Sequence, residues 1–322
     1  MVEQIKQAYL DYKKESARQP YQDYNTDIEK YTIYSTESDS VVHINKEETP
    51  YSKKGLKNIR EGLGDVAGVI KRRLVNTLRS EQRRRWSYVK ERGKIDSRRL
   101  HHALNGTSNL IYKQRSDAKR LDVAINVGID LSGSMSGEPI ELATQMALAL
   151  GDVLSSLNIP YSVFGYSTGE LPPGAQEGFS RFGSLWIRVF KDFSEPWSKG
   201  ALNVCDMPKH IQMNALEGEA LRFGVQQLIN QPKSRKVMFL FSDGEVYPGY
   251  GDLGSCQKYL RSMIKASEKA GVEVIGFGIK SDHVKHYFPK HVVINNIEDL
   301  VTQPLRELEN ILRKGQTTRG SK

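Results

Sequence analysis

From Asp122 onward, short continuous apolar runs alternate with longer segments in which apolar residues recur every three or four positions. The first pattern is typical of buried strands and the second of amphipathic helices. Strands that are apolar on both faces indicate a mostly parallel sheet with helices on both sides. We therefore predict an α/β, doubly wound domain over residues 121–313. Its predicted strands are 122–130, 161–166, 185–190, 236–241, 272–279 and 292–294, and its predicted helices are 140–157, 217–229, 255–270 and 298–313.

The region before this domain has a different pattern. Apolar residues recur at helical spacing between Leu56 and Leu78, and basic residues crowd the positions between them. This pattern predicts a basic helical extension over residues 53–120, with a helical region that ends near Gly93. Trp86 and Tyr88 are expected to be core anchors of this extension.

Shorter elements complete the chain. A second short helix should begin at Asp96 or Ser97, because either side chain can cap a helix N-terminus, and a strand is expected at 111–114. Residues 1–52 are polar and rich in tyrosine, so we expect an arm there, and residues 314–322 should form a tail.

Charge is spread unevenly along the chain, whose net charge is +9. Residues 53–120 carry 20 basic and 6 acidic side chains, a balance of +14, whereas residues 1–52 and 121–322 come to −4 and −1. Such asymmetry indicates a region that meets an anionic partner. A solvated helical face and a nucleic-acid-binding surface both fit this stretch, and no known nucleic-acid-reading motif occurs in it.

Composition indicates the cellular compartment in which the protein is expected to work. No apolar run approaches the roughly 20 residues that span a bilayer, so we expect no membrane partner. The first residues contain no apolar signal core, which predicts a cytoplasmic protein. Cys205 and Cys256 lie far apart in the sequence, and we expect both to be thiols in a reducing compartment.

Oxygen-bearing side chains follow the first strand of the predicted domain. Asp130, Ser132 and Ser134 occupy alternate positions, and in an extended segment such residues point the same way. Hard oxygen ligands with a single charge suit Mg²⁺, or another divalent cation such as Mn²⁺, that keeps part of its water shell. At the end of strand 236–241, Asp243 could supply a second carboxylate, although an aspartate there could also simply cap a turn.

Other chemistries find less support in the sequence. The phosphate-binding P-loop pattern GxxxxGK[ST] does not occur. A nucleophilic serine would need a partnered histidine, and His210, His283, His286 and His291 have no telling context. We therefore predict no catalytic residues and no activity of the chain alone.

The strand, the DLSGSM loop and the Ser242-Asp243-Gly244 turn resemble the metal-ion-dependent adhesion site of von Willebrand factor A domains. The resemblance implies a further ligand, usually a threonine, before the third helix of the domain. The corresponding segment, 214–221, has no threonine, so Asn214 or Glu217 would have to supply that oxygen. Thr168 is a weaker, outer candidate. The predicted metal ligands are thus Asp130, Ser132, Ser134, Asp243, Glu217 and Asn214.

The flanking sequence resembles the CobT-type subunit of aerobic cobaltochelatase. The residues that carry this resemblance are Arg73-Leu74, Trp86, Gly93-Lys94-Ile95-Asp96, Arg99-Leu100, Tyr112-Lys113-Gln114, Gly165-Tyr166-Ser167-Thr168, Glu217-Gly218-Glu219-Ala220-Leu221, Phe241-Ser242-Asp243-Gly244, Gly276-Phe277-Gly278-Ile279 and His286-Tyr287. The resemblance implies a subunit without its own ATPase site, which pairs with an AAA+ partner and a large chelatase subunit for cobalt insertion into a corrin. It also implies that a cation held by Asp130, Ser132, Ser134 and Asp243 accepts a carboxylate from the partner.

Overall fold

A computed structural model of the protein describes residues 28, 30–45, 50–64, 68–69, 72, 86–100, 104–105, 110–115, 122–169, 178–244, 246, 248, 251–296, 298–299 and 310. Most of the predicted closing helix at 298–313 and the tail at 314–322 lie outside these residues. Arg83, Arg84 and Arg85 of the basic stretch lie outside them as well.

A seven-stranded sheet forms the centre of the molecule, in the order β1-β7-β6-β5-β8-β9-β10. Neighbours from β6 through β5, β8 and β9 to β10 run parallel, while β7 pairs antiparallel with β6. The mostly parallel α/β sheet predicted from the sequence is therefore confirmed. The strands are β1 (Ser40–His43), β5 (Val123–Asp130), β6 (Tyr161–Thr168), β7 (Leu185–Lys191), β8 (Arg235–Ser242), β9 (Val272–Ile279) and β10 (His291–Ile294).

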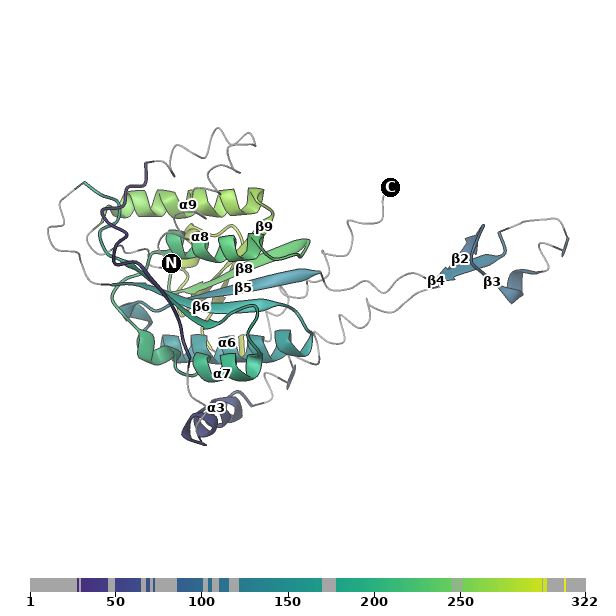
Figure 1. Cartoon of the computed structure of the whole chain (residues 1–322), viewed down its shortest axis with the longest axis horizontal. Helices are drawn as coiled ribbons and strands as arrows, with labels where there is room; N and C mark the ends of the chain where they lie inside the picture. The colour runs from purple at the N-terminus through teal and green to yellow at the C-terminus, as the bar shows by residue number, and fades with distance from the viewer. Residues whose placement is uncertain are drawn as a thin grey trace.

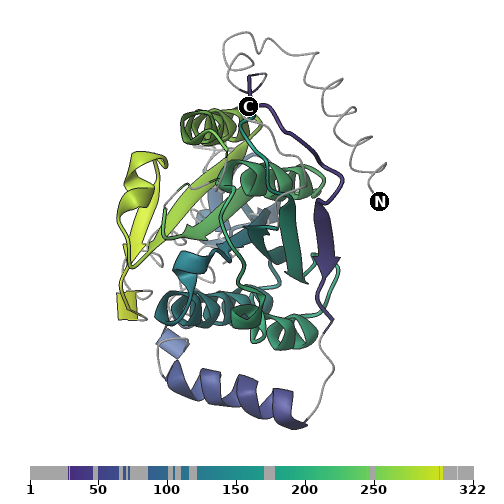
Figure 2. The same cartoon turned by 90° about the vertical axis from the view of Figure 1, so that its left-hand side faces the viewer.

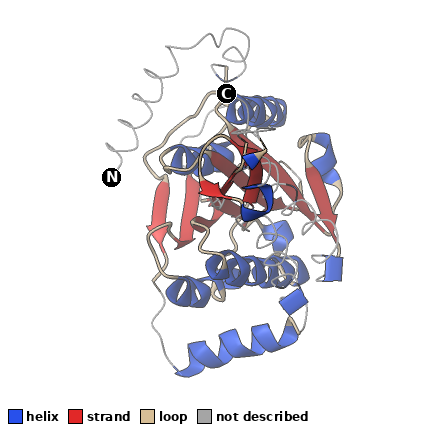
Figure 3. Cartoon of the chain, turned by 90° about the vertical axis from the view of Figure 1, so that its right-hand side faces the viewer, coloured by secondary structure: helices blue, strands red, loops and turns tan. Residues whose placement is uncertain are grey.

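Helices cover both faces of this sheet, and Figure 1 shows α8 and α9 on one side with α6 and α7 on the other. Figure 3 shows the same layers, with the strands lying between the helices. A further helix, α3, packs outside α6 and α7 (Figure 2). The bounds are α3 (Pro50–Gly62), α6 (Glu138–Ser156), α7 (Trp197–Val204), α8 (Glu217–Ile229) and α9 (Leu253–Lys269).

The central strand β5 is buried along its whole length. Val127 and Ile129 point into the core beneath α6, whereas Ala124 belongs to the core beneath α8 and α9. Gly128 lies where a Cβ atom would come within 2.9 Å of the Leu240 and Phe164 side chains. The absence of a side chain at Gly128 therefore lets the layer beneath α8 close onto β5.

A separate three-stranded sheet, in the order β2-β4-β3, forms from residues that precede the main domain. Its strands are β2 (Trp86–Lys90), β3 (Lys94–Ile95) and β4 (Tyr112–Arg115). The prediction of a helical region up to Gly93 is thus wrong at β2, because antiparallel pairing with the distant β4 determines its conformation. The short helix is confirmed: a 3₁₀ turn spans Ser97–Arg99, and Asp96 caps it by accepting from the Arg98 N–H.

The segment from residue 30 to 45 runs along the main sheet and adds β1 to its edge, parallel to β7. The buried guanidinium of Arg181 fastens this segment, since it hydrogen-bonds both Asp39 and Glu219 of α8. Tyr31 adds a 2.9 Å hydrogen bond to the same Glu219 and stacks on Tyr259 of α9 at a centroid distance of 4.0 Å. Part of the stretch expected as an arm is therefore tied to the domain by buried ionic contacts.

Candidate metal site at the carboxyl end of the central strand

The candidate site lies where three neighbouring strands end. Asp130 is the last residue of β5, Ser242 the last of β8 and Thr168 the last of β6. Chain connections from β5 lead to β6 on one side, while β8 occupies the other side. Ligands of open α/β sheets gather at such a point, where the strand order reverses, outside the carboxyl ends.

Asp130 is completely buried, and both of its carboxylate oxygens have partners. The Ser132 N–H donates to Oδ1 over 2.7 Å, and the Ser242 hydroxyl donates to Oδ2 over 3.0 Å. Burial, with the neighbouring charge of Asp243, raises the pKa of Asp130 to about 7. The carboxylate is therefore held in a fixed orientation at a place where its negative charge is costly.

The two serines of the DLSGSM loop lie together as the sequence predicted. Their hydroxyl oxygens are 3.0 Å apart. Ser134, however, belongs to a 3₁₀ turn at Gly133–Met135 rather than to an extended segment, so the turn and not strand alternation brings the hydroxyls together. Ser132 is buried and Ser134 exposed, which places this pair between the buried carboxylate and solvent.

Glu217, at the start of α8, joins the same buried cluster. Its Oε1 lies 3.4 Å from the Ser242 hydroxyl, and its Oε2 finds no hydrogen-bond partner among the described residues. Burial and then the charge of Asp130 raise the pKa of Glu217 well above its usual value. The single proton of the Ser242 hydroxyl lies closer to Asp130 than to Glu217, so the cluster is short of hydrogen-bond donors for its carboxyl oxygens.

Ser242 was not among the residues predicted from the sequence, yet it connects the cluster. Its hydroxyl oxygen also accepts the Gly244 N–H over 2.9 Å, which fixes the turn after β8. That turn presents Asp243, a half-buried residue whose charge raises the pKa of both Asp130 and Glu217. The position of Ser242 at the end of a predicted strand, next to Asp243, was the feature of the sequence that could have indicated this role.

The structure gives Thr168 and Asn214 a shared role at the β6 side of the site. The Thr168 hydroxyl accepts the Asn214 N–H over 3.1 Å, and the Thr168 N–H donates to the Asn214 carbonyl over 2.9 Å. A third bond runs from the Ser167 hydroxyl to that carbonyl. The backbone at Asn214 is thus fixed beside the loop that carries the serines.

These residues fit a hard divalent cation as a mixed set of oxygens. Within the described part of the chain, no three His, Cys, Asp or Glu side chains converge as a cation site, so carboxylates alone do not form it. The serine hydroxyls and the unpartnered Glu217 oxygen are the further oxygens that could face a cation here. Oxygen donors of this kind are those that Mg²⁺ and Mn²⁺ prefer in proteins.

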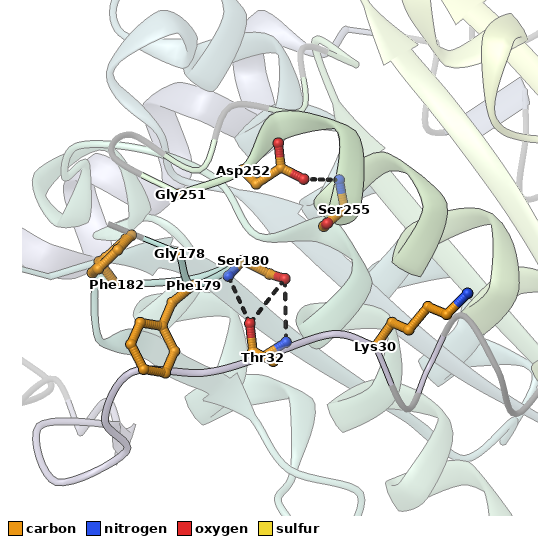
Figure 4. A pocket seen from close by; sticks show the side chains of 9 residues that line it. All are labelled: Lys30, Thr32, Gly178, Phe179, Ser180, Phe182, Gly251, Asp252 and Ser255. Carbon is orange, nitrogen blue, oxygen red and sulfur yellow. Dashed lines mark hydrogen bonds between the residues drawn. The ribbon is translucent and has the colours of Figure 1, made fainter. Parts of the chain in front are cut away.

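A pocket of about 500 Å³ lies elsewhere, between the segment at Lys30 and Thr32, the loop 178–182 and the start of α9 (Figure 4). Thr32 and Ser180 bond each other through their hydroxyls and N–H groups, and Asp252 accepts the Ser255 N–H over 2.7 Å. None of the predicted metal ligands lines it. These polar groups satisfy one another, so we assign no ligand to the pocket.

The sheet order and the cluster at the end of β5 define a von Willebrand factor A-type domain. The family model described as "Cobalamin biosynthesis protein CobT VWA domain" matches residues 111–314, and the chain belongs to this family. No helix in the described part of the chain has the length and apolar character needed to cross a membrane.

Solved structures with a similar arrangement share little sequence with this chain. The pilus adhesin SpaC from Lactobacillus rhamnosus GG is 16% identical, with a TM-score of 0.41 over 60% of this chain and 30% of that one. The PilB minor pilin from Streptococcus sanguinis is 13% identical, with a TM-score of 0.45 over 65% of this chain and 66% of that one. The vWF domain of the Mfa5 pilus tip protein from Porphyromonas gingivalis is 11% identical, with a TM-score of 0.41 over 64% and 99%. The chain thus spans less than two thirds of the length of SpaC and of PilB.

Proposed function

We propose that this chain is the docking subunit of a cobaltochelatase-like complex and that it binds an AAA+ ATPase partner through a divalent cation. The observation that carries the proposal is the buried Asp130, whose two carboxylate oxygens are oriented by Ser132 and Ser242 at the end of the central strand. Membership of the CobT family supports the part of the proposal that places the chain in a cobaltochelatase-like complex. The sequence contains no P-loop, so ATP hydrolysis would belong to the partner.

Each predicted ligand would make a different contribution to binding Mg²⁺ or Mn²⁺. Asp130 would supply the principal negative charge, and Ser132 and Ser134 neutral oxygens at the solvent side. Asp243 and Glu217 would add charge from the β8 and α8 sides, with Asn214 as a further oxygen. When bound, the cation supplies an open coordination position for a carboxylate of the partner. Ser242 and Thr168 would not bind the cation themselves. Their hydrogen bonds orient Asp130 and the Asn214 backbone in the chain without a partner.

Co-purification with P-loop ATPase subunits encoded near its gene tests this proposal. We expect the partner to remain bound in Mg²⁺, to dissociate in EDTA and to return when Mg²⁺ is restored. Asp130→Ala should abolish binding. Asp122→Asn is the matched control, because Asp122 precedes the opposite end of β5 and bonds the Ser234 N–H there. Equal retention after chelation and in Asp130→Ala would refute metal-dependent docking.

Nucleic-acid association remains the competing proposal for the basic stretch 53–120, with the A-type domain as a scaffold. It predicts DNA or RNA binding that weakens steeply with salt. Charge reversal at Arg83, Arg84 and Arg85 would then reduce binding and flatten the salt dependence. We expect no such effect if the stretch is a solvated surface or meets a protein partner. We also propose that the chain works in the cytoplasm. In the complex it would act together with a large chelatase subunit on a tetrapyrrole substrate.

A further inference from the structure

An exposed methionine borders the candidate metal site. Met213 exposes 58% of its surface, and it lies in the segment between α7 and α8 that passes the DLSGSM loop. The described residues with large exposed apolar side chains also include Val42 on the edge strand β1 and Leu253 at the start of α9. Neither of those two belongs to a loop that forms the site.

The backbone around Met213 is fixed on both sides. The Gln212 N–H donates to the Leu131 carbonyl over 2.8 Å, and the Gly133 N–H donates to the Met213 carbonyl over 3.0 Å. The next residue, Asn214, is bonded to Thr168 at the end of β6. These bonds fix the Met213 backbone against the loop that carries Ser132 and Ser134, and the Met213 side chain is exposed there. Keeping an apolar side chain in water costs free energy that a partner covering it would recover.

The rim of the site differs in charge on its two sides. On the β6 side, next to Met213, the exposed residues Ser134, Ser136 and Gln212 are uncharged. On the β8 side, the turn at Gly244 packs against the 281–286 loop, which carries the ion pair of Asp282 and Lys285. A ligand seated on the cation would thus meet a neutral, partly apolar surface on one side and charges on the other.

We propose that Met213 is a specificity contact for the partner and that the docking segment carries an apolar side chain next to its carboxylate. This inference rests on the proposed function, since the carboxylate addresses the cation. Methionine suits the role because its unbranched, polarisable side chain adapts to different apolar surfaces. A rim of uncharged residues also costs less to cover with an apolar side chain than a charged rim would, because less hydration is lost.

Three immobilised pentapeptides test the inference with the whole chain in Mg²⁺. They are Gly-Leu-Asp-Leu-Gly, Gly-Ser-Asp-Ser-Gly and Gly-Leu-Asn-Leu-Gly, and their binding is compared by biosensor at equal peptide density. We expect the Leu-Asp-Leu peptide to bind about fivefold or more tightly than Ser-Asp-Ser, the scale of one buried aliphatic contact. Met213→Ser should remove that preference, and Leu253→Ser, at an exposed apolar position outside the site, should leave it intact.

The outcomes separate the two proposals. Equal binding of Leu-Asp-Leu and Ser-Asp-Ser, both dependent on Mg²⁺, would overturn the Met213 contact and leave the metal-docking proposal standing. Equal binding of the Asp and Asn peptides, or binding that survives EDTA, would overturn the metal-docking proposal itself. Failure of every peptide to bind at millimolar concentration would count against both. Terbium luminescence checks that Met213→Ser keeps its cation site. Met213 adjoins the proposed ligand Asn214, but the side chain that changes is not itself a proposed ligand.

Discussion

The Ser242 hydroxyl donates a 3.0 Å hydrogen bond to Oδ2 of Asp130 and so joins the carboxyl ends of two neighbouring strands, β8 and β5. The same hydroxyl lies 3.4 Å from Glu217 and accepts the N–H of Gly244. One small side chain therefore contacts two of the predicted metal ligands, Asp130 and Glu217, and fixes the turn that follows a third, Asp243.

Ser242→Ala should weaken cation binding about tenfold or more, the scale found when a group that orients a metal ligand is removed. The hydroxyl that fixes Asp130 would be lost, although no proposed ligand changes. Isothermal titration with Mn²⁺ measures the effect. Ser162→Ala is the control, because that buried hydroxyl bonds the Lys191 carbonyl and not a ligand. It should cost about 1 kcal/mol of stability and leave the affinity unchanged; equal affinity losses in both variants would refute the role of Ser242.

Without a divalent cation, the free energy of unfolding should fall between about pH 4 and pH 7. The pKa of Asp130 is raised to about 7 in the folded chain, so over this range the unfolded chain is ionised while the folded one keeps its proton. Below pH 4 the Asp130 carboxyl is protonated in both states, so it causes no loss of stability. Above pH 7 the loss in the free energy of unfolding is complete, on the order of 4 kcal/mol.

Mg²⁺ should reverse this loss by favouring the ionised carboxylate. Melting temperatures in EDTA and in MgCl₂ should thus diverge as the pH rises from 5 to 7.5. Asp130→Asn should reduce the divergence between the curves, and the raised pKa of Glu217 should leave a smaller pH dependence in both buffers. Parallel curves for the wild-type chain in the two buffers would contradict the prediction.

Arg181→Met should lower the free energy of unfolding by about 3–5 kcal/mol, because it leaves Glu219 buried without its cation. Chemical denaturation measures the change. Arg60→Met is a matched comparison at an ion pair with Asp152 in which the Arg60 side chain is 41% exposed, and it should cost less than about 1 kcal/mol. Similar losses in the two variants would mean that the buried contacts of Arg181 stabilise the fold no more than an ion pair at the surface does.

Gly244→Ala should destabilise the turn that presents Asp243. Gly244 has a φ of +79°, and a Cβ there would lie 2.6 Å from the Val284 backbone nitrogen. We expect a loss of about 1–3 kcal/mol together with weaker Mn²⁺ binding. Gly254→Ala lies in the first turn of α9, where a Cβ would come no closer than 3.7 Å to the Asp252 carboxylate, and it should be neutral or stabilising. A neutral Gly244→Ala would show that the turn adapts without strain.

Local sequence patterns were sufficient for the strands β5 to β10 of the main sheet and for the helices α6, α8 and α9, but not for β1 or α7. The helix predicted at 217–229 has those bounds in the structure, because apolar spacing and burial on one face agree there. The loop after β5 was also predictable, since an apolar run leads directly to Asp130. These elements depend on residues that are near one another in the chain.

Elements that depend on distant partners were harder to predict. β2 follows a stretch with helical apolar spacing but pairs with β4. β1 is held to the sheet edge by contacts such as that of Asp39 with Arg181. The role of Ser242 likewise exists only once β8 lies beside β5. Nothing in the local sequence around these residues records those neighbours.

Titration of the whole chain with Mn²⁺ by isothermal calorimetry tests the central claim most directly. We predict one cation per wild-type chain, no detectable binding in Asp130→Ala, and wild-type binding in Asp122→Asn. Asp130→Ala that binds Mn²⁺ with wild-type affinity and stoichiometry would contradict a metal site at the end of β5.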